Sequence, residues 1–422
     1  MAADKLHGDL VAALTAIPLI DPHSHIDPYA PTSRTLDDIL GYHYYTELAH
    51  SAGMSQAPLA ADVPPVERVR AILGHIDRFN NTAQYRWLID ILQSFLGWES
   101  NHVSAADADA LFAKSEAVFG QADWEQQVFE KTNLEKIFLT NEFDDSLEGF
   151  DTARYVPCLR TDGLVFQLNL PVIRERLAKR TGIQVGDAAT LRAAIRKLFE
   201  HFVAHGARAC AISLPPSFTP VHIPSAEIDR VLSGFEPNDA DAAVRASAVF
   251  WTIAECCREF ALPFDLMIGV NRRVYRNGVY QGQDLFDSRT SLVQYQELFN
   301  AFPDVVFPVS VLSSFQNQEL VSHSWIFPNV ITSGHWWYSN IPTYIASDLR
   351  ARLQAVPKTK QIGYYSDAYK LEFVRPKFGM YRSVLAHVLA DEFVRPGILS
   401  ETQAVELGRQ LLRENVRQIF KI

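Results

Sequence analysis

Two histidines separated by one residue end the first apolar run of the chain, in the sequence DPHSH at 21–25. Side chains at positions i and i+2 of a strand point to the same face, so the two imidazoles can reach one cation. A chance pair of surface or core histidines is the competing interpretation, because the chain contains 13 histidines. The strand-end position between Asp21 and Asp27 favours a divalent metal site at His23 and His25.

A carboxylate at the end of the last predicted strand could supply a third ligand. Asp367 closes the run Gln361–Asp367, and the first and eighth strands are neighbours if the sheet closes into a barrel. Two histidines and one carboxylate would leave coordination positions open for water or substrate. The alternative is that Asp367 caps the helix that follows. The adjacency of the first and last strands favours the metal ligand.

The elements that must position these side chains are short β-branched or aromatic runs between helical patterns. The predicted strands are Pro18–Asp21, Leu134–Thr140, Arg154–Arg160, Ala207–Leu214, Pro263–Gly269, Asp304–Leu312, Val330–Gly334 and Gln361–Asp367. Helices are predicted between them and after them, for example at Ala188–His205, Ala242–Phe260, Ser291–Phe302, Pro342–Leu353 and Tyr381–Phe393. Eight strands alternating with helices predict an α/β fold, a (β/α)8 barrel of TIM type. A flat doubly wound sheet is the alternative, but the chain lacks the GxGxxG and P-loop turns that bind phosphate.

One gap between predicted strands is much longer than the others. It follows the first strand and carries helical patterns at Leu36–Ser51, Val66–Phe79, Ala83–Leu96, Ala105–Val118 and Trp124–Lys131. An insertion at this point lies over the C-terminal mouth of a barrel, where such folds keep their active sites. We therefore predict a single metal-dependent barrel domain over residues 1–422, with a helical lid at about 34–131.

Composition restricts the partners of the chain. Its 422 residues are 48% hydrophobic and 21% charged, and 39 Lys and Arg stand against 49 Asp and Glu, a net charge of −10. An acidic chain without a basic run is a poor ligand for nucleic acid or an anionic membrane, so a small molecule is the expected partner. The four cysteines lack disulfide-scaffold or CxxC spacing, and Val11–Ile20 lacks the features of a signal peptide or a membrane span. We expect a cytoplasmic homo-oligomer.

Motifs spread over nearly the whole chain carry a resemblance to a known family. They are DPHSH at 21–25, YHY at 42–44, AHSAG at 49–53, LRTD at 159–162, SLPP at 213–216, MIGV at 267–270, GHWW at 334–337 and SDA at 366–368. The HxH pair with a strand-eight aspartate resembles the amidohydrolase superfamily. Within it, the chain resembles the shorter, divergent branch of the uronate isomerases, which interconvert aldose and ketose forms of glucuronate and galacturonate.

The resemblance implies roles for individual residues. His23, His25 and Asp367 would hold one divalent metal ion, zinc in the first place and manganese in the second. His43 and Tyr44 would face the substrate from the lid, where Tyr44 could take part in proton transfer. A phenol of ordinary pKa, about 10, would need a neighbouring cation to act as a base at neutral pH.

Further residues are candidates for substrate binding. Arg160 aligns with an arginine that binds the substrate carboxylate, and the alternative is an ion pair with Asp162. Arg272 follows the fifth strand and could hold an acidic substrate or lie in a solvated loop. His335 and Trp336 follow the seventh strand, where aromatic faces suit the apolar side of a sugar or pack against the next helix.

The chain also departs from the family pattern. No histidine ends the fourth, fifth or sixth predicted strand, so one metal ion is expected where related enzymes hold two. The family carries an arginine, implicated in proton transfer, two residues after the strand-eight aspartate, and here that position is Tyr369, a further catalytic-site residue. Lys370 would project about 100° away on a regular helix. We therefore expect slow turnover of glucuronate and galacturonate and a related acid as the natural substrate.

Two other functions remain open. In a hydrolase, metal-bound water would attack a lactone, ester or amide of a sugar acid, with Asp367 taking the proton. This chemistry needs no arginine at position 369. A protein that binds sugar acids without turnover is disfavoured, because it would have no use for three convergent metal ligands. The sequence thus favours a metal-dependent enzyme of uronate isomerase type.

Overall fold

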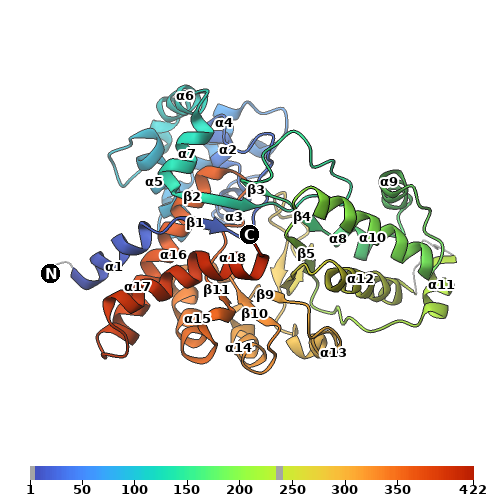
Figure 1. Cartoon of the computed structure of the whole chain (residues 1–422). Coiled ribbons are helices and arrows are strands. Elements are labelled where there is room, and N and C mark those ends of the chain that lie inside the picture. The colour runs from blue at the N-terminus through green and yellow to red at the C-terminus, as the bar shows by residue number, and fades with distance from the viewer. Residues whose placement is uncertain (1–4, 234–240) are drawn as a thin grey trace.

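The computed structural model describes residues 5–233 and 241–422, in which parallel strands alternate with helices, as the predicted barrel requires (Figure 1). The strands are β1 (Leu19–Asp21), β2 (Leu134–Phe138), β3 (Tyr155–Val156), β4 (Cys158–Arg160), β5 (Ala209–Leu214), β6 (Phe264–Ile268), β9 (Phe307–Val311), β10 (Val330–Ser333) and β11 (Gln361–Ile362). Each predicted strand is present, but the eighth is shorter than predicted: β11 ends at Ile362, and Asp367 lies in the segment that follows it. The third is divided into β3 and β4 at Pro157, which has no N–H to offer the ladder. A short antiparallel pair, β7 (Val270–Asn271) and β8 (Leu285–Phe286), lies outside the barrel order.

The barrel closes between its first and last strands without a regular ladder. Strand pairing gives the orders β1-β2-β3 and β4-β5-β6-β9-β10-β11. Between the segments that follow β11 and β1, the Asp367 N–H donates to the His23 carbonyl at 3.1 Å. The Ser366 N–H donates to the carboxylate of Asp21 at 2.9 Å. The two segments that carry the predicted metal ligands are therefore joined directly at this seam.

Outer helices cover the strands, and the core lies between the two layers (Figure 1). The helices are α1 (Lys5–Thr15), α8 (Asp162–Gln167), α9 (Pro171–Thr181), α10 (Ala188–Ala204), α11 (Ser225–Ser233), α12 (Ala242–Glu259), α13 (Gln296–Ala301), α14 (Asn317–Ile326), α15 (Pro342–Ala355), α16 (Val374–Leu389), α17 (Glu401–Arg409) and α18 (Asn415–Phe420). Every residue of β6 and β9 is buried, as expected for parallel strands covered on both faces. The Phe250 ring on α12 packs 5.0 Å from Phe264 on β6.

The long connection from β1 to β2 is helical, as predicted. It contains α2 (Leu36–Leu40), α3 (His43–Ser51), α4 (Pro65–Leu73), α5 (Ala83–Leu96), α6 (Ala108–Phe119) and α7 (Trp124–Thr132), most of which gather on one side of the strands (Figure 1). The predicted helix Leu36–Ser51 is interrupted: α2 ends at Leu40, and Tyr42, whose backbone is extended, precedes α3 at His43. Treating this connection as a lid on a single domain remains a prediction. Over the described residues, we find no helix with the length and apolar character that crossing a membrane requires.

Candidate active site

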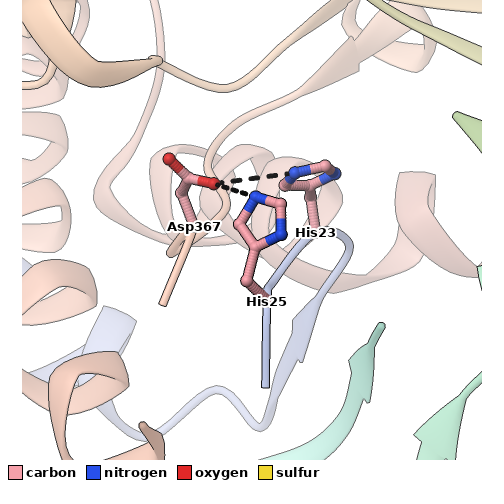
Figure 2. Close-up of side chains that lie close together, drawn as sticks. All are labelled: His23, His25 and Asp367. Atoms are coloured by element: carbon pink, nitrogen blue, oxygen red, sulfur yellow. Dashed lines mark ion pairs between the residues drawn. The ribbon is translucent and has the colours of Figure 1, made fainter. Parts of the chain in front are cut away.

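The predicted metal ligands converge at the seam between β1 and β11. His25 Nε2 lies 3.2 Å, and His23 Nε2 3.6 Å, from Asp367 Oδ1. One ligand atom from each residue lies within 4.8 Å of the other two. Figure 2 shows both imidazoles directed toward the carboxylate. The period-two spacing of the histidines therefore produces the common face that the sequence predicted.

Two buried polar atoms of these three residues lack hydrogen-bond partners, which indicates that the cluster suits a bound cation. His23 Nε2 and Asp367 Oδ1 are buried without a hydrogen-bond partner of good geometry, which is costly unless another ligand satisfies them. The Thr140 hydroxyl donates to the Ser24 carbonyl at 3.0 Å, so its oxygen can accept from His25 Nδ1 at 2.7 Å. This contact leaves the Nε2 lone pair of His25 available for a metal ion.

Burial and the neighbouring charges set the protonation of the cluster. Burial lowers the pKa of His25, which favours the neutral imidazole. Burial alone would raise the pKa of Asp367, but its close contact with His25 and the nearby positive charges of His23 and Lys377 outweigh burial and bring the pKa to about 2. A neutral imidazole and an ionised carboxylate are the forms that bind a divalent metal.

Asp265 contacts the ring nitrogen of His23 that faces away from Asp367. The sequence did not reveal this residue as part of the site. It lies on β6, is buried, and places its Oδ2 3.5 Å from His23 Nδ1. Burial works against a charge on His23, but the hydrogen bond and charge of Asp265 raise its pKa. A carboxylate on the far nitrogen orients a metal-binding histidine. The available signal was a single charged residue inside the apolar run Phe264–Ile268.

Replacing Asp265 by asparagine should weaken metal binding by roughly 10- to 100-fold, the usual effect of losing such a partner. The dissociation constant can be measured by competition with a chromophoric chelator. Asp348→Asn is a matched control, because Asp348 is also buried and lies 3.6 Å from a histidine, His335, that does not line the cavity. Equal affinities in the two variants would contradict an orienting role for Asp265.

A cavity of about 330 Å³ opens next to the metal ligands, large enough for a small organic acid. The cavity is lined by the segments that follow β1 and β11, by the helical connection between β1 and β2, and by residues at the ends of β4, β5 and β6. Among the predicted site residues it is lined by His23, His25, His43, Arg160, Arg272, Trp336, Asp367 and Tyr369.

Both predicted arginines face this cavity while each pairs with a carboxylate. Arg160 Nε lies 3.3 Å from Asp162 Oδ2, so Arg160 forms the predicted ion pair. The same side chain also lines the cavity. Arg272 donates to Asp284 at 2.7 Å and to the Ser213 hydroxyl at 2.9 Å. The guanidinium groups are therefore held in fixed orientations beside the metal ligands.

Comparison with known proteins identifies the family. The family model described as glucuronate isomerase matches residues 2–420. The chain belongs to the glucuronate isomerase family. This confirms the predicted family, within the amidohydrolase superfamily, and the prediction of a uronate isomerase-like enzyme.

Individual members of the family resemble the chain along its full length. A uronate isomerase of Corynebacterium efficiens is 22% identical over 461 residues, covering 98% of this chain and 95% of that protein. The crystal structure of a uronate isomerase from Thermotoga maritima superimposes with a TM-score of 0.88 at 19% identity, covering 99% of this chain and 97% of the other. The crystal structure of a glucuronate isomerase from Caulobacter crescentus superimposes with a TM-score of 0.90 at 18% identity, covering 100% of this chain and 95% of the other. The structural similarity confirms the barrel fold.

Two of the predicted site residues, Tyr44 and His335, lie behind the cavity wall, which corrects their expected placement. Tyr44 is buried between His43 and Trp87, at ring distances of 4.3 and 5.7 Å, and burial raises its pKa well above 10. His335 is buried against Asp348, and burial lowers its pKa to about 4. Neither residue lines the cavity, so we assign neither a direct contact with substrate.

Tyr369 occupies the position of the family arginine and faces the metal site. Its ring stacks on His25 with centroids 4.9 Å apart and an interplanar angle of 27°. The segment that contains it is not a regular helix, and a 3-10 turn begins only at Leu371. Lys370 is turned away, because its Nζ donates to the carbonyl of Ala30 at 2.7 Å. Lys370 therefore does not take the place of the arginine.

Proposed function

We propose that this protein is a metal-dependent aldose–ketose isomerase of uronates or closely related sugar acids. The observation that carries the proposal is the arrangement of His23, His25 and Asp367 beside Arg160 in one cavity. Family membership supports an isomerase in place of the other reactions that a metal at such a site performs.

The charges that line the cavity support a substrate with one carboxylate. Two arginines, Arg160 and Arg272, stand against three aspartates, Asp162, Asp284 and Asp367, which leaves one net negative charge when the histidines are neutral. A bound divalent cation would reverse this to one net positive charge. A monoanionic sugar acid then neutralises the site, and the planar Arg160 guanidinium suits a bidentate contact with its carboxylate.

Isomerisation moves a proton between two neighbouring carbons of the open-chain sugar. A divalent ion on the three ligands would polarise a substrate oxygen and so acidify the adjacent C–H. We propose that His43 assists this transfer from the lid, because it lines the cavity and its buried Nδ1 has no hydrogen-bond partner. Burial lowers the pKa of His43 to about 3, so its imidazole stays neutral and can hold a substrate hydroxyl by a hydrogen bond while the proton moves. Trp336 contributes an aromatic wall.

The decisive experiment supplies metal-loaded protein with uronates and with aldonolactones, and follows ketose formation and acid release together. Ketose without acid establishes the isomerase. Acid release without ketose would overturn the proposal in favour of a lactone hydrolase, the alternative that tolerates Tyr369.

Three further proposals concern the metal ion, the cellular compartment and the oligomeric state. We propose zinc as the ion, with manganese as the alternative, because two imidazoles, one carboxylate and open positions match catalytic zinc sites.

We propose a cytoplasmic homo-oligomer. All four cysteines are free and buried, which suits a reducing compartment, and Phe315, Trp325 and Ile326 are large apolar side chains exposed on the surface. Metal analysis and light scattering test the ion and the oligomeric state.

Replacing Tyr369 by arginine should raise the rate of glucuronate isomerisation roughly 10- to 150-fold, because one charge-assisted contact with an enediolate is worth about 1.5–3 kcal/mol. Steady-state kinetics on glucuronate and galacturonate measure the change. Tyr369→Phe is the control, since it keeps the ring that stacks on His25 and adds no charge. Efficient turnover by the wild type, or no gain in the arginine variant, would contradict our interpretation of this position.

A further inference from the structure

Lys377 is a completely buried cation that the proposed reaction does not use. It lies on α16, and its Nζ donates to the Ser366 carbonyl at 2.7 Å and to the Tyr42 hydroxyl at 3.0 Å. Within 5–233 and 241–422, no carboxylate forms an ion pair with it. A buried charge without such a partner is costly, so a lysine at this position requires a specific reason.

Its aromatic surroundings connect the barrel to the helical connection between β1 and β2. The Nζ lies 5.0 Å from the ring centres of Tyr42 and Tyr44 and 4.9 Å from that of Trp87. Ring faces at these distances attract a cation. Tyr42 and Tyr44 stand at the start of α3 and Trp87 on α5, whereas Lys377 belongs to the helix after the last strand. One ammonium group therefore joins the predicted lid to the barrel.

The same ammonium group holds the backbone around a metal ligand. It binds the carbonyl of Ser366 directly, and the Tyr42 hydroxyl, which accepts from Lys377, donates to the carbonyl of Asp367 at 2.8 Å. These two carbonyls belong to the peptide groups on either side of the Asp367 α-carbon. Fixing both peptide planes fixes the direction of the Asp367 side chain.

Asp367 needs such support because its φ is 52°, in the left-handed region that non-glycine residues rarely adopt. Releasing either carbonyl would allow the residue to relax toward an ordinary backbone conformation. Its carboxylate would then turn away from His23 and His25. The contacts of Lys377 and Tyr42 oppose this relaxation.

We propose that Lys377 is a positioning residue that couples docking of the lid to the placement of the metal-binding carboxylate of Asp367. The inference rests on the metal site of the proposed function. With the lid in place, Tyr42 completes the relay from Lys377 to the Asp367 carbonyl. When the lid separates, that carbonyl loses its donor and the three metal ligands are no longer held together.

The test measures metal affinity in the absence of substrate. Lys377→Met keeps the length of the side chain and removes its donors, and Tyr42→Phe removes only the hydroxyl. We expect the dissociation constant for zinc to rise at least tenfold in Lys377→Met and several-fold in Tyr42→Phe. Because Lys377 holds the Tyr42 hydroxyl that binds the Asp367 carbonyl, the losses in the double variant should be less than additive. The visible spectrum of the cobalt-substituted protein should change in both single variants, since it reports coordination geometry.

Arg382→Met is the matched control. Arg382 is a buried cation on the same helix, and it donates to the carbonyl of Ile17 at 2.9 Å and does not line the cavity. Its loss should lower the melting temperature and leave zinc affinity and the cobalt spectrum unchanged.

Wild-type affinity and an unchanged cobalt spectrum in folded Lys377→Met would overturn the coupling, as would fully additive losses in the double variant. If Lys377→Met does not fold, the zinc affinity and cobalt spectrum of Tyr42→Phe decide the question, because this variant keeps the lysine and the aromatic ring. Wild-type values in Tyr42→Phe would then overturn the coupling. A wild type that binds zinc but isomerises no uronate refutes the proposed function and leaves this test intact. A wild type that binds no metal ion overturns the inference.

Discussion

Replacing His25 by alanine should leave the purified protein with almost no bound divalent metal, whereas the wild type should hold about one equivalent. The described structure brings His23, His25 and Asp367 together as ligands, and the Nε2 of His25 lies 3.2 Å from the carboxylate. Two ligands cannot retain an ion that three hold in an open site. Elemental analysis after gel filtration measures the metal content.

The control is His102→Ala, which removes an exposed histidine of the helical connection between β1 and β2 and should not change the metal content. The melting temperature of apo His25→Ala should fall only modestly, because the substitution removes the contacts of His25 with Thr140, Asp367 and Tyr369 but leaves the apolar core of the barrel intact. Two equivalents in the wild type, or an unchanged content in His25→Ala, would refute a mononuclear site. Chelation of the wild type should abolish isomerisation, and added metal should restore it.

Replacing Arg160 by lysine should raise the KM for a carboxylate-bearing substrate by roughly 5- to 150-fold, which corresponds to about 1–3 kcal/mol. Lysine keeps the charge but loses the planar pair of donors that matches a carboxylate. Arg160 is half-buried at the cavity, and its contact with Asp162 at 3.3 Å orients the guanidinium. Steady-state kinetics on the best uronate measure the effect, and thermal unfolding should be nearly unchanged.

Arg176→Lys provides the matched control. Arg176 contacts Glu142, the carboxylate that also lies 3.8 Å from Arg160, but it does not line the cavity. It should therefore show the wild-type KM. If Arg160→Lys also does so, Arg160 is only a structural ion-pair residue and its assignment to the substrate carboxylate is wrong.

The fold and the cluster of candidate metal ligands were predictable because their signals are local or follow from barrel topology. Buried parallel strands are continuous apolar runs, and every predicted strand is found in the structure. The spacing of His23 and His25 determines their common face from a period of two residues. Asp367 could be added because a closed barrel makes the last strand a neighbour of the first.

By itself, then, the sequence determined the order of elements, the family and the residues that can bind a metal. The tertiary structure decided how these residues are supported and which of the others reach the cavity. Asp265 and Lys377 contact residues far away in the chain, at His23 and Tyr42, and only packing brings such pairs together. Packing also places Tyr44 behind the cavity wall, because its ring contacts Trp87, which is far away in the chain and belongs to α5.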